Sequence, residues 1–434
     1  GVQVPFESVR RRVRFAARPP KPVKAHRPGR PPFAIPAGAT DMLPLAGYRA
    51  VAATLVVVGH IMLAARVEQR LPLASPFHSL AVVVPMFFGL AGYVAYRPFV
   101  HANLTGAKPP GAARYIWKRI VRIYFLYVIA LTVYLVAVPF FRPDTFLEYV
   151  QLYTLTQIYN PELLQKGLPA AWFEAALFPL YIAMPAFAAG ARAIARRNGM
   201  SSLRQRLHAE IFMCGIIIAI SVVCRAILIA GQVEASTTWP ISYADYVGIG
   251  MLVAIASVWA KGGGRLPRFV DAWRNHPNVS LFFLIATILI FERVNPPVNG
   301  PFTLDMQLFR FTAYFVMVGL ILVPAVLSGP FYWLNRLMAT FPMVILGRGS
   351  YSTYIWHQLV LVAIAYQFGA TIDSSMLWWF LFAGIVLSNA VGLVSCVVLE
   401  GSLENLKDYS LRDRSGAVRR NVPVPGRPTP SVAR

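Results

Sequence analysis

The sequence predicts an all-α membrane protein, a polytopic bundle of about ten transmembrane helices with both termini in the cytoplasm. Three observations predict this class. Of the 434 residues, 57% are hydrophobic and only 14% are charged, whereas an ordinary soluble domain is about one-quarter charged. Apolar runs of about 20 residues, each long enough to cross the hydrocarbon core as a helix, also recur along the chain.

The expected spans leave one basic tail at each end. The apolar runs cover residues 43–65, 79–102, 116–140, 171–190, 210–230, 241–260, 278–292, 309–328, 342–367 and 376–399. Residues 1–42, rich in Arg and Pro, and residues 403–434 are expected to be disordered cytoplasmic tails. Residues 43–402 then form one transmembrane domain.

The distribution of basic residues predicts the topology. With the N-terminus inside, the inner loops and tails hold 32 of the 41 Lys and Arg residues and the outer loops hold 5. Because positive charge marks the cytoplasmic side, we expect a multi-pass protein of the plasma (inner) membrane. The net charge of +23 suits the anionic inner leaflet; we expect no nucleic-acid partner, because no folded domain interleaves basic residues with stacking aromatics.

Arg49 and His60 lie within the first apolar run, eleven residues apart. In an α-helix this spacing places both side chains on one face, about 16 Å apart along the axis. Ionisable residues in a membrane segment usually mark a functional pathway. The alternative is that Arg49 extends toward the helix end and His60 is a hydrogen-bonded residue of the bundle.

The predicted depths divide the ionisable residues into two groups. Cations gather at the cytoplasmic ends of the spans, where an anionic ligand such as a phosphate would bind them. These cations are Arg49, Arg97, Arg119 and Arg122. Two histidines and one carboxylate are expected toward the outer side: His60, His357 and Glu174. For Glu174 the alternative is an interfacial acid facing water, and for His357 a hydrogen-bonded packing residue.

Blocks of sequence in a fixed order give the chain a family resemblance. They are Leu45–Ala50 with Gly59-His60, Val84–Tyr93, Lys118–Tyr124, Trp172–Tyr181 with Pro185, Gly248–Met251, Leu346-Gly347 with Ser350–His357, and Glu400. In the residues and order of these blocks, the chain resembles the acyltransferase-3 family of integral membrane O-acyltransferases over roughly residues 43–402. Ala46, Ala91 and Leu177 depart from the family's usual Asp, Ser and Glu. Glu174, three residues before Leu177 and on nearly the same helical face, is positioned to replace the missing Glu.

The resemblance implies that an acyl group, often acetyl, is transferred from cytoplasmic acyl-CoA to a hydroxyl of an envelope glycan, glycolipid or lipid. Acyl-CoA would be a co-substrate, with no permanently bound cofactor. We expect His60 to be the general base, because an imidazole suits proton transfer at neutral pH. Glu174 and His357 would orient it or stabilise the imidazolium, and the arginines would hold the phosphates of CoA.

Two other functions also fit the ionisable residues. A proton-coupled transporter or lipid flippase needs the same residue types, although the chain lacks the internal repeat common in such folds. The second of these functions is that of a structural or sensory membrane protein without catalysis. The three cysteines, Cys214, Cys224 and Cys396, lie in apolar runs without metal-ligand spacing, so we predict neither a disulfide framework nor a metal site.

Overall fold

The computed structural model describes residues 42–65, 77–294, 303–368 and 376–401. By contacts the chain divides into two units, residues 1–36 and 37–434, and all of the described residues belong to the second. The described part is helical and contains no β-strand, which confirms the all-α class. The predicted tails, residues 1–42 and 403–434, lie outside the described residues except for Met42.

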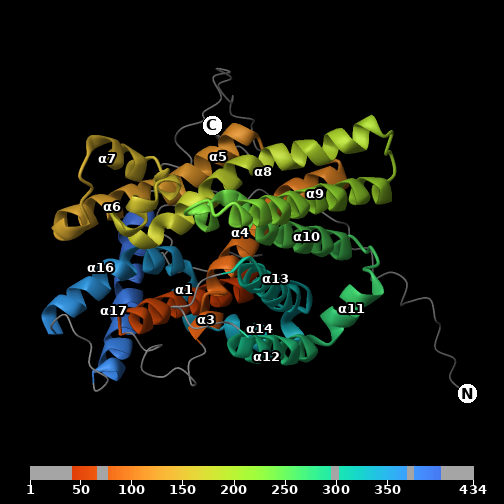
Figure 1. The fold of residues 1–434 in the computed structure, drawn as a ribbon. Helices are drawn as coiled ribbons and strands as arrows, with labels where there is room; N and C mark the ends of the chain where they lie inside the picture. Colours follow the sequence, from red (N-terminus) through yellow and green to blue (C-terminus); the bar gives the residue numbers. More distant parts are fainter. Residues whose placement is uncertain (1–41, 66–76, 295–302, 369–375, 402–434) are drawn as a thin grey trace, which may run out of the picture. The chain divides into compact units, whose positions relative to one another are not determined.

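Among the described residues, nine helical segments are long and apolar enough to cross a membrane, judged by length and composition. Their helices are α1 (Leu43–Ala64), α4 (Val83–Thr105), α5 (Ala112–Arg119) continued by α6 (Phe125–Ala137), α8 (Trp172–Arg197), α9 (Leu203–Ala230), α10 (Ala244–Lys261), α12 (Pro277–Val294), α13 (Leu304–Leu327) and α17 (Leu377–Ser395). The chain is therefore a multi-pass membrane protein (Figure 1).

The predicted span over residues 342–367 differs from the structure. It is divided into α15 (Phe341–Arg348) and α16 (Ser350–Phe368), and neither helix is among the nine apolar segments. Gly349 separates the two helices. Polar residues early in α16, including Ser352, Thr353 and His357, lower its hydropathy.

Two glycine contacts fix the packing of α4 against α10. A Cβ atom on Gly250 would overlap the carbonyl of Gly89, and one on Gly92 would overlap the carbonyl of Val247. Only glycine permits backbones to approach this closely. These two helices lie side by side in Figure 1. The first turn of α1 is packed similarly, because Gly347 of α15 lies against the carbonyl of Ala46.

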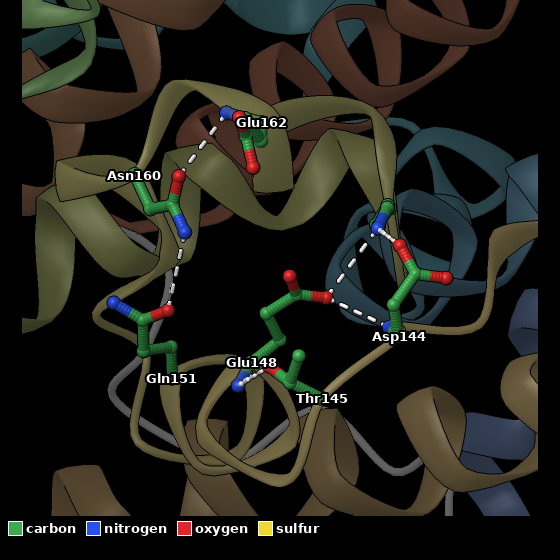
Figure 2. A network of polar contacts seen from close by, with 7 residues as sticks. Asp144, Thr145, Glu148, Gln151, Asn160 and Glu162 are labelled. Atoms are coloured by element: carbon green, nitrogen blue, oxygen red, sulfur yellow. Dashed lines mark hydrogen bonds and ion pairs between the residues drawn. The ribbon is translucent and has the colours of Figure 1, made fainter.

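The segment between α6 and α8 is folded by its own polar contacts. It contains α7 (Phe146–Tyr153), whose N-cap Thr145 accepts a hydrogen bond from the Glu148 backbone N–H at 3.3 Å. Lys166 contacts the carboxylates of Asp144 and Glu148. Figure 2 shows Asp144, Thr145 and Glu148 grouped at the start of α7.

Hydrogen bonds attach this segment to the helices that it covers. The hydroxyl groups of Tyr124 and Tyr127 donate to the carbonyls of Tyr153 and Leu152, at 2.8 and 2.6 Å. The Ala170 N–H donates to Gln358 Oε1 of α16 at 2.9 Å. The start of α8 is thereby held beside α16.

Candidate active site

Three arginines line one cavity of about 120 Å³. Arg49 comes from α1, Arg119 from the end of α5, and Arg122 from the π-helical turn Ile120–Tyr124 that joins α5 to α6. The rest of the wall is mainly aromatic and aliphatic: Phe87, Leu90, Ala91, Val94, Ile123, Phe173, Glu174, Leu177, Phe178, Tyr181, Ser350, Tyr351 and Tyr354. The structure therefore gathers cations from two distant parts of the sequence around one space.

Neighbouring tyrosines hold the basic turn in place. The Tyr351 hydroxyl donates to the carbonyl of Ile123, inside the π-helical turn, at 2.8 Å. The Arg119 guanidinium lies over the ring of Tyr181, 4.6 Å from its centroid, a favourable cation–π arrangement. A π-helical turn is often found at a functional site, because its extra residue redirects the side chains around it.

The cavity arginines form no ion pair with an acid among the described residues. Within the part of the chain that the structure describes, no ion pair joins Arg49, Arg119 or Arg122 to a carboxylate. A nearby acid, Glu400, accepts a hydrogen bond from the Ser352 hydroxyl at 2.6 Å. Three arginines gathered in one place without an ion-paired carboxylate form a site for an anion.

Glu174 and Leu177 line the same cavity, as their three-residue spacing predicts. Glu174 is 1% exposed, and neither of its carboxylate oxygens has a hydrogen-bond partner among the described residues. Native proteins rarely leave such atoms unpaired. Two acceptors are thus available to donors of a ligand in the cavity.

The two membrane histidines lie together, on α1 and α16, the helices that carry Arg49 and Tyr354 of the cavity wall. The ring centroids of His60 in α1 and His357 in α16 are 4.7 Å apart. His60 Nδ1 lies 2.9 Å from the Val56 carbonyl, and His357 Nδ1 contacts the Tyr354 carbonyl. Because a carbonyl only accepts, both Nδ1 atoms carry the proton, and both Nε2 atoms keep a free lone pair.

Tyr354 connects the histidine pair to the cavity. Its ring lines the cavity and lies 5.6 Å from that of His357, centroid to centroid. Its hydroxyl donates to the Ala170 carbonyl. Neither His60 nor His357 lines the cavity itself, and no hydrogen bond joins Glu174 to either histidine in the described chain. The expected pair of a histidine with the Glu174 carboxylate is therefore absent from the described residues. The Val56 carbonyl instead accepts at His60 Nδ1, where a carboxylate would bind.

Arg97 does not reach the cavity. Its Nη1 atom donates to Met42 Sδ at 3.4 Å, and its side chain is not part of the cavity wall. Of the four arginines expected to bind an anion, the structure brings three together.

Sequence reasoning missed a second buried charge site. Arg225 of α9 and Asp245 of α10 form an ion pair at 2.9 Å, with side chains 4% and 0% exposed. Arg225 also donates to the Ser242 carbonyl at 2.7 Å and lies over the ring of Phe311. Opposite charges at similar depths in consecutive spans were the signal that could have revealed it.

A second missed group lies between α4, α8 and α9. The buried Glu210 carboxylate accepts hydrogen bonds from Tyr96 and Asn103, and Arg192 donates to Asn103 at 3.0 Å. The polar groups of these side chains are hydrogen-bonded to one another, so we infer that they stabilise the packing of the three helices. In the described residues, no group of three or more His, Cys, Asp or Glu side chains could hold a metal ion.

The sequence of this chain matches a known protein family. The family described as an acyltransferase domain matches residues 45–397, which is most of the chain. No curated protein matches the chain, and neither does any solved structure.

Proposed function

Because this chain belongs to the acyltransferase-3 family, a family of membrane acyltransferases, we propose that it transfers an acetyl or other short acyl group from cytoplasmic acyl-CoA to a hydroxyl. The acceptor would be a glycan, glycolipid or lipid of the cell envelope. One observation carries the proposal: three arginines, none paired with a carboxylate in the described chain, line a cavity that Tyr354 connects to two histidines with free lone pairs.

The proposed donor matches the cavity in charge. The phosphates of CoA would bind Arg49, Arg119 and Arg122 through charge-assisted hydrogen bonds. The cavity, about 120 Å³ in volume, would take the thin pantetheine arm, and the arginines in its wall would bind the phosphates that follow. The rest of the nucleotide would lie at its cytoplasmic mouth. The pantetheine amides would donate to the free oxygens of Glu174.

The proposed chemistry uses one nitrogen of His60. Its Nε2 takes the proton of the acceptor hydroxyl while the oxygen attacks the thioester carbonyl. Collapse of the tetrahedral intermediate breaks the C–S bond, and the imidazolium returns the proton to the leaving thiolate. The Val56 carbonyl holds the tautomer that this step needs, and His357 packs against the reacting ring. A covalent acyl-His60 intermediate is the second route, and double-displacement kinetics would identify it.

The variant His60→Ala tests the base. Loss of a general base lowers transfer by about 10²- to 10⁴-fold, measured with radiolabelled acetyl-CoA in membranes that contain equal amounts of protein. His276→Ala, at an exposed histidine outside the site, is the matched control and should retain activity. Full activity of His60→Ala would exclude the assignment.

The same assay separates transfer from transport. An acyltransferase releases free CoA in step with labelled product, whereas a proton-coupled carrier or flippase moves its solute without releasing CoA. Solute movement that leaves acyl-CoA intact would reject the proposed function. Mass spectrometry of envelope glycans and lipids from a deletion strain would identify the acceptor by the missing acyl mass.

A further inference from the structure

A second and larger cavity lies between α9, α10, α13 and the short helix α11 (Arg268–Asn275). Its volume is about 1280 Å³, about ten times that of the arginine-lined cavity. The wall is almost entirely apolar and includes Trp259, Trp273 and Phe315. We call this cavity the α11 groove. An apolar space of this size offers ordered water few polar partners, and lipid chains are the apolar molecules that a bilayer supplies to fill it.

One end of the α11 groove is basic. Arg204 and His208, in the first two turns of α9, and Arg265, just after α10, all line it, and no Asp or Glu does. Because α9 and α10 are consecutive antiparallel spans, the start of one and the end of the other lie on the same side. Neither Arg204 nor Arg265 makes a side-chain hydrogen bond or ion pair with the described residues.

The helix that closes the groove is built for a membrane surface. In α11, Phe269, Val270 and Trp273 line the groove while Arg268 and Asn275 do not. Phe269 remains 70% exposed. A short helix with one apolar face and one charged face lies in the interfacial plane of a bilayer. The groove therefore opens where lipid headgroups are found.

We infer that the α11 groove binds an anionic phospholipid. The acyl chains occupy the apolar wall, and the phosphate lies against Arg204 and Arg265. Charge complementarity selects this occupant, because basic residues line the groove at headgroup depth without any acidic side chain. This lipid site is separate from the arginine-lined cavity and is independent of the proposed acyl transfer.

The apolar part is tested by filling the groove. Gly319 of α13 lines it, and a Cβ atom there would lie 3.7 Å from Trp273, an ordinary contact distance, so Gly319→Leu places a side chain in the groove beside Trp273. The full chain is purified from membranes, and bound lipids are counted by native mass spectrometry. We expect the wild type to retain phosphatidylglycerol and Gly319→Leu to lose it. Ala186→Leu adds a side chain at an exposed position of α8, which does not line the groove, and should retain the lipid.

The charge part is tested in nanodiscs of phosphatidylcholine with and without a minor fraction of phosphatidylglycerol. Replacing each cation by Gln should weaken phosphatidylglycerol retention roughly five-fold, in Arg204→Gln and in Arg265→Gln. Arg197→Gln, an exposed residue at the end of α8, is the control and should have no effect. Equal retention of phosphatidylcholine, or no bound lipid in the wild type, would overturn the inference. A wild-type dimer that Gly319→Leu converts to a monomer would also overturn it, since a second copy would then fill the groove.

Discussion

Two arginine sites within the helices differ in what surrounds the guanidinium group. The side chain of Arg225 is 4% exposed and is paired with the Asp245 carboxylate, the Ser242 carbonyl and the ring of Phe311, and of its nitrogens Nε has no hydrogen-bond partner among the described residues. Arg49, Arg119 and Arg122 border a cavity, and no carboxylate pairs with them in the described chain. The first site is closed and the second is open to a ligand.

The comparison shows how a charge in a membrane segment can be interpreted. A buried ion pair balances desolvation with its own partner and needs nothing from outside. Like charges gathered without a counter-ion repel one another until an anion arrives. The first arrangement therefore supports the fold, and the second supports binding.

The largest effect is expected from breaking the closed site. Asp245→Asn leaves Arg225 buried without its counter-charge, which destabilises a protein by about 3–5 kcal/mol. The thermal unfolding midpoint in detergent should fall sharply. Asp271→Asn, at an exposed pair with Arg274 at 3.9 Å, is the control and should change stability by less than about 1 kcal/mol. Equal midpoints for Asp245→Asn and wild type would mean that the pair is not a structural element.

The open site should respond in the opposite way. Arg122→Gln removes one cation from the cavity, so we expect CoA binding to weaken roughly ten- to hundred-fold, the value of a hydrogen bond to a charged group. Stability should be unchanged or slightly higher, because repulsion within the cluster is relieved. Isothermal titration of CoA and a thermal scan on the same preparation measure both effects. If Arg122→Gln left the affinity for CoA unchanged and lowered the thermal stability, Arg122 would be a structural cation like Arg225.

Arg97→Gln sharpens the boundary of the open site. Because Arg97 donates to Met42 and does not line the cavity, its removal should weaken CoA binding much less than Arg122→Gln does. The same titration provides the measurement. If Arg97→Gln and Arg122→Gln weakened binding equally, the anion site would have to extend beyond the cavity seen here.

The smallest effect is expected at Lys166, whose ion pairs are partly exposed, in contrast to the buried pair. Its hydrogen bond to Asp144 raises the pKa of Lys166 above its ordinary value of 10.5. A raised pKa means that its contribution to stability is complete below pH 10.5 and is lost as the pH rises through the higher folded value. The small difference in unfolding midpoint between wild type and Lys166→Met should therefore stay constant up to about pH 10 and shrink only as the pH rises above about 10.5. A difference that grows with pH would contradict this sign.

Hydrophobic runs predicted most of the fold because the length of a membrane-spanning helix is set by the bilayer. Errors occur where that rule does not apply. The helix α8 continues to Arg197 rather than stopping near residue 190, because a helix can extend beyond the apolar layer with a basic last turn. The break between α15 and α16 at Gly349 falls within residues 342–367, which form one continuous apolar run in the sequence.

The site was only partly predictable for a related reason. Sequence gives the depth of a charged residue but not the direction in which it points around its helix, so Arg97 could not be distinguished from Arg49. Similar depths suggested that His60 and His357 are neighbours, but not that Val56 rather than Glu174 bonds to His60. Nothing in the residue pattern revealed that Ile120–Tyr124 departs from α-helical geometry.

That departure makes the basic entry of α5 and α6 sensitive to chain length. A π-helical turn holds one residue more than the α-helix that would otherwise run through it. Deleting one residue beside the turn, with the π winding kept, would rotate everything before the deletion by about 100° relative to α6. Arg119 would then swing away from Tyr181 even though every side chain around the cavity was still present. In this stretch, therefore, the spacing of residues is as essential as their identity.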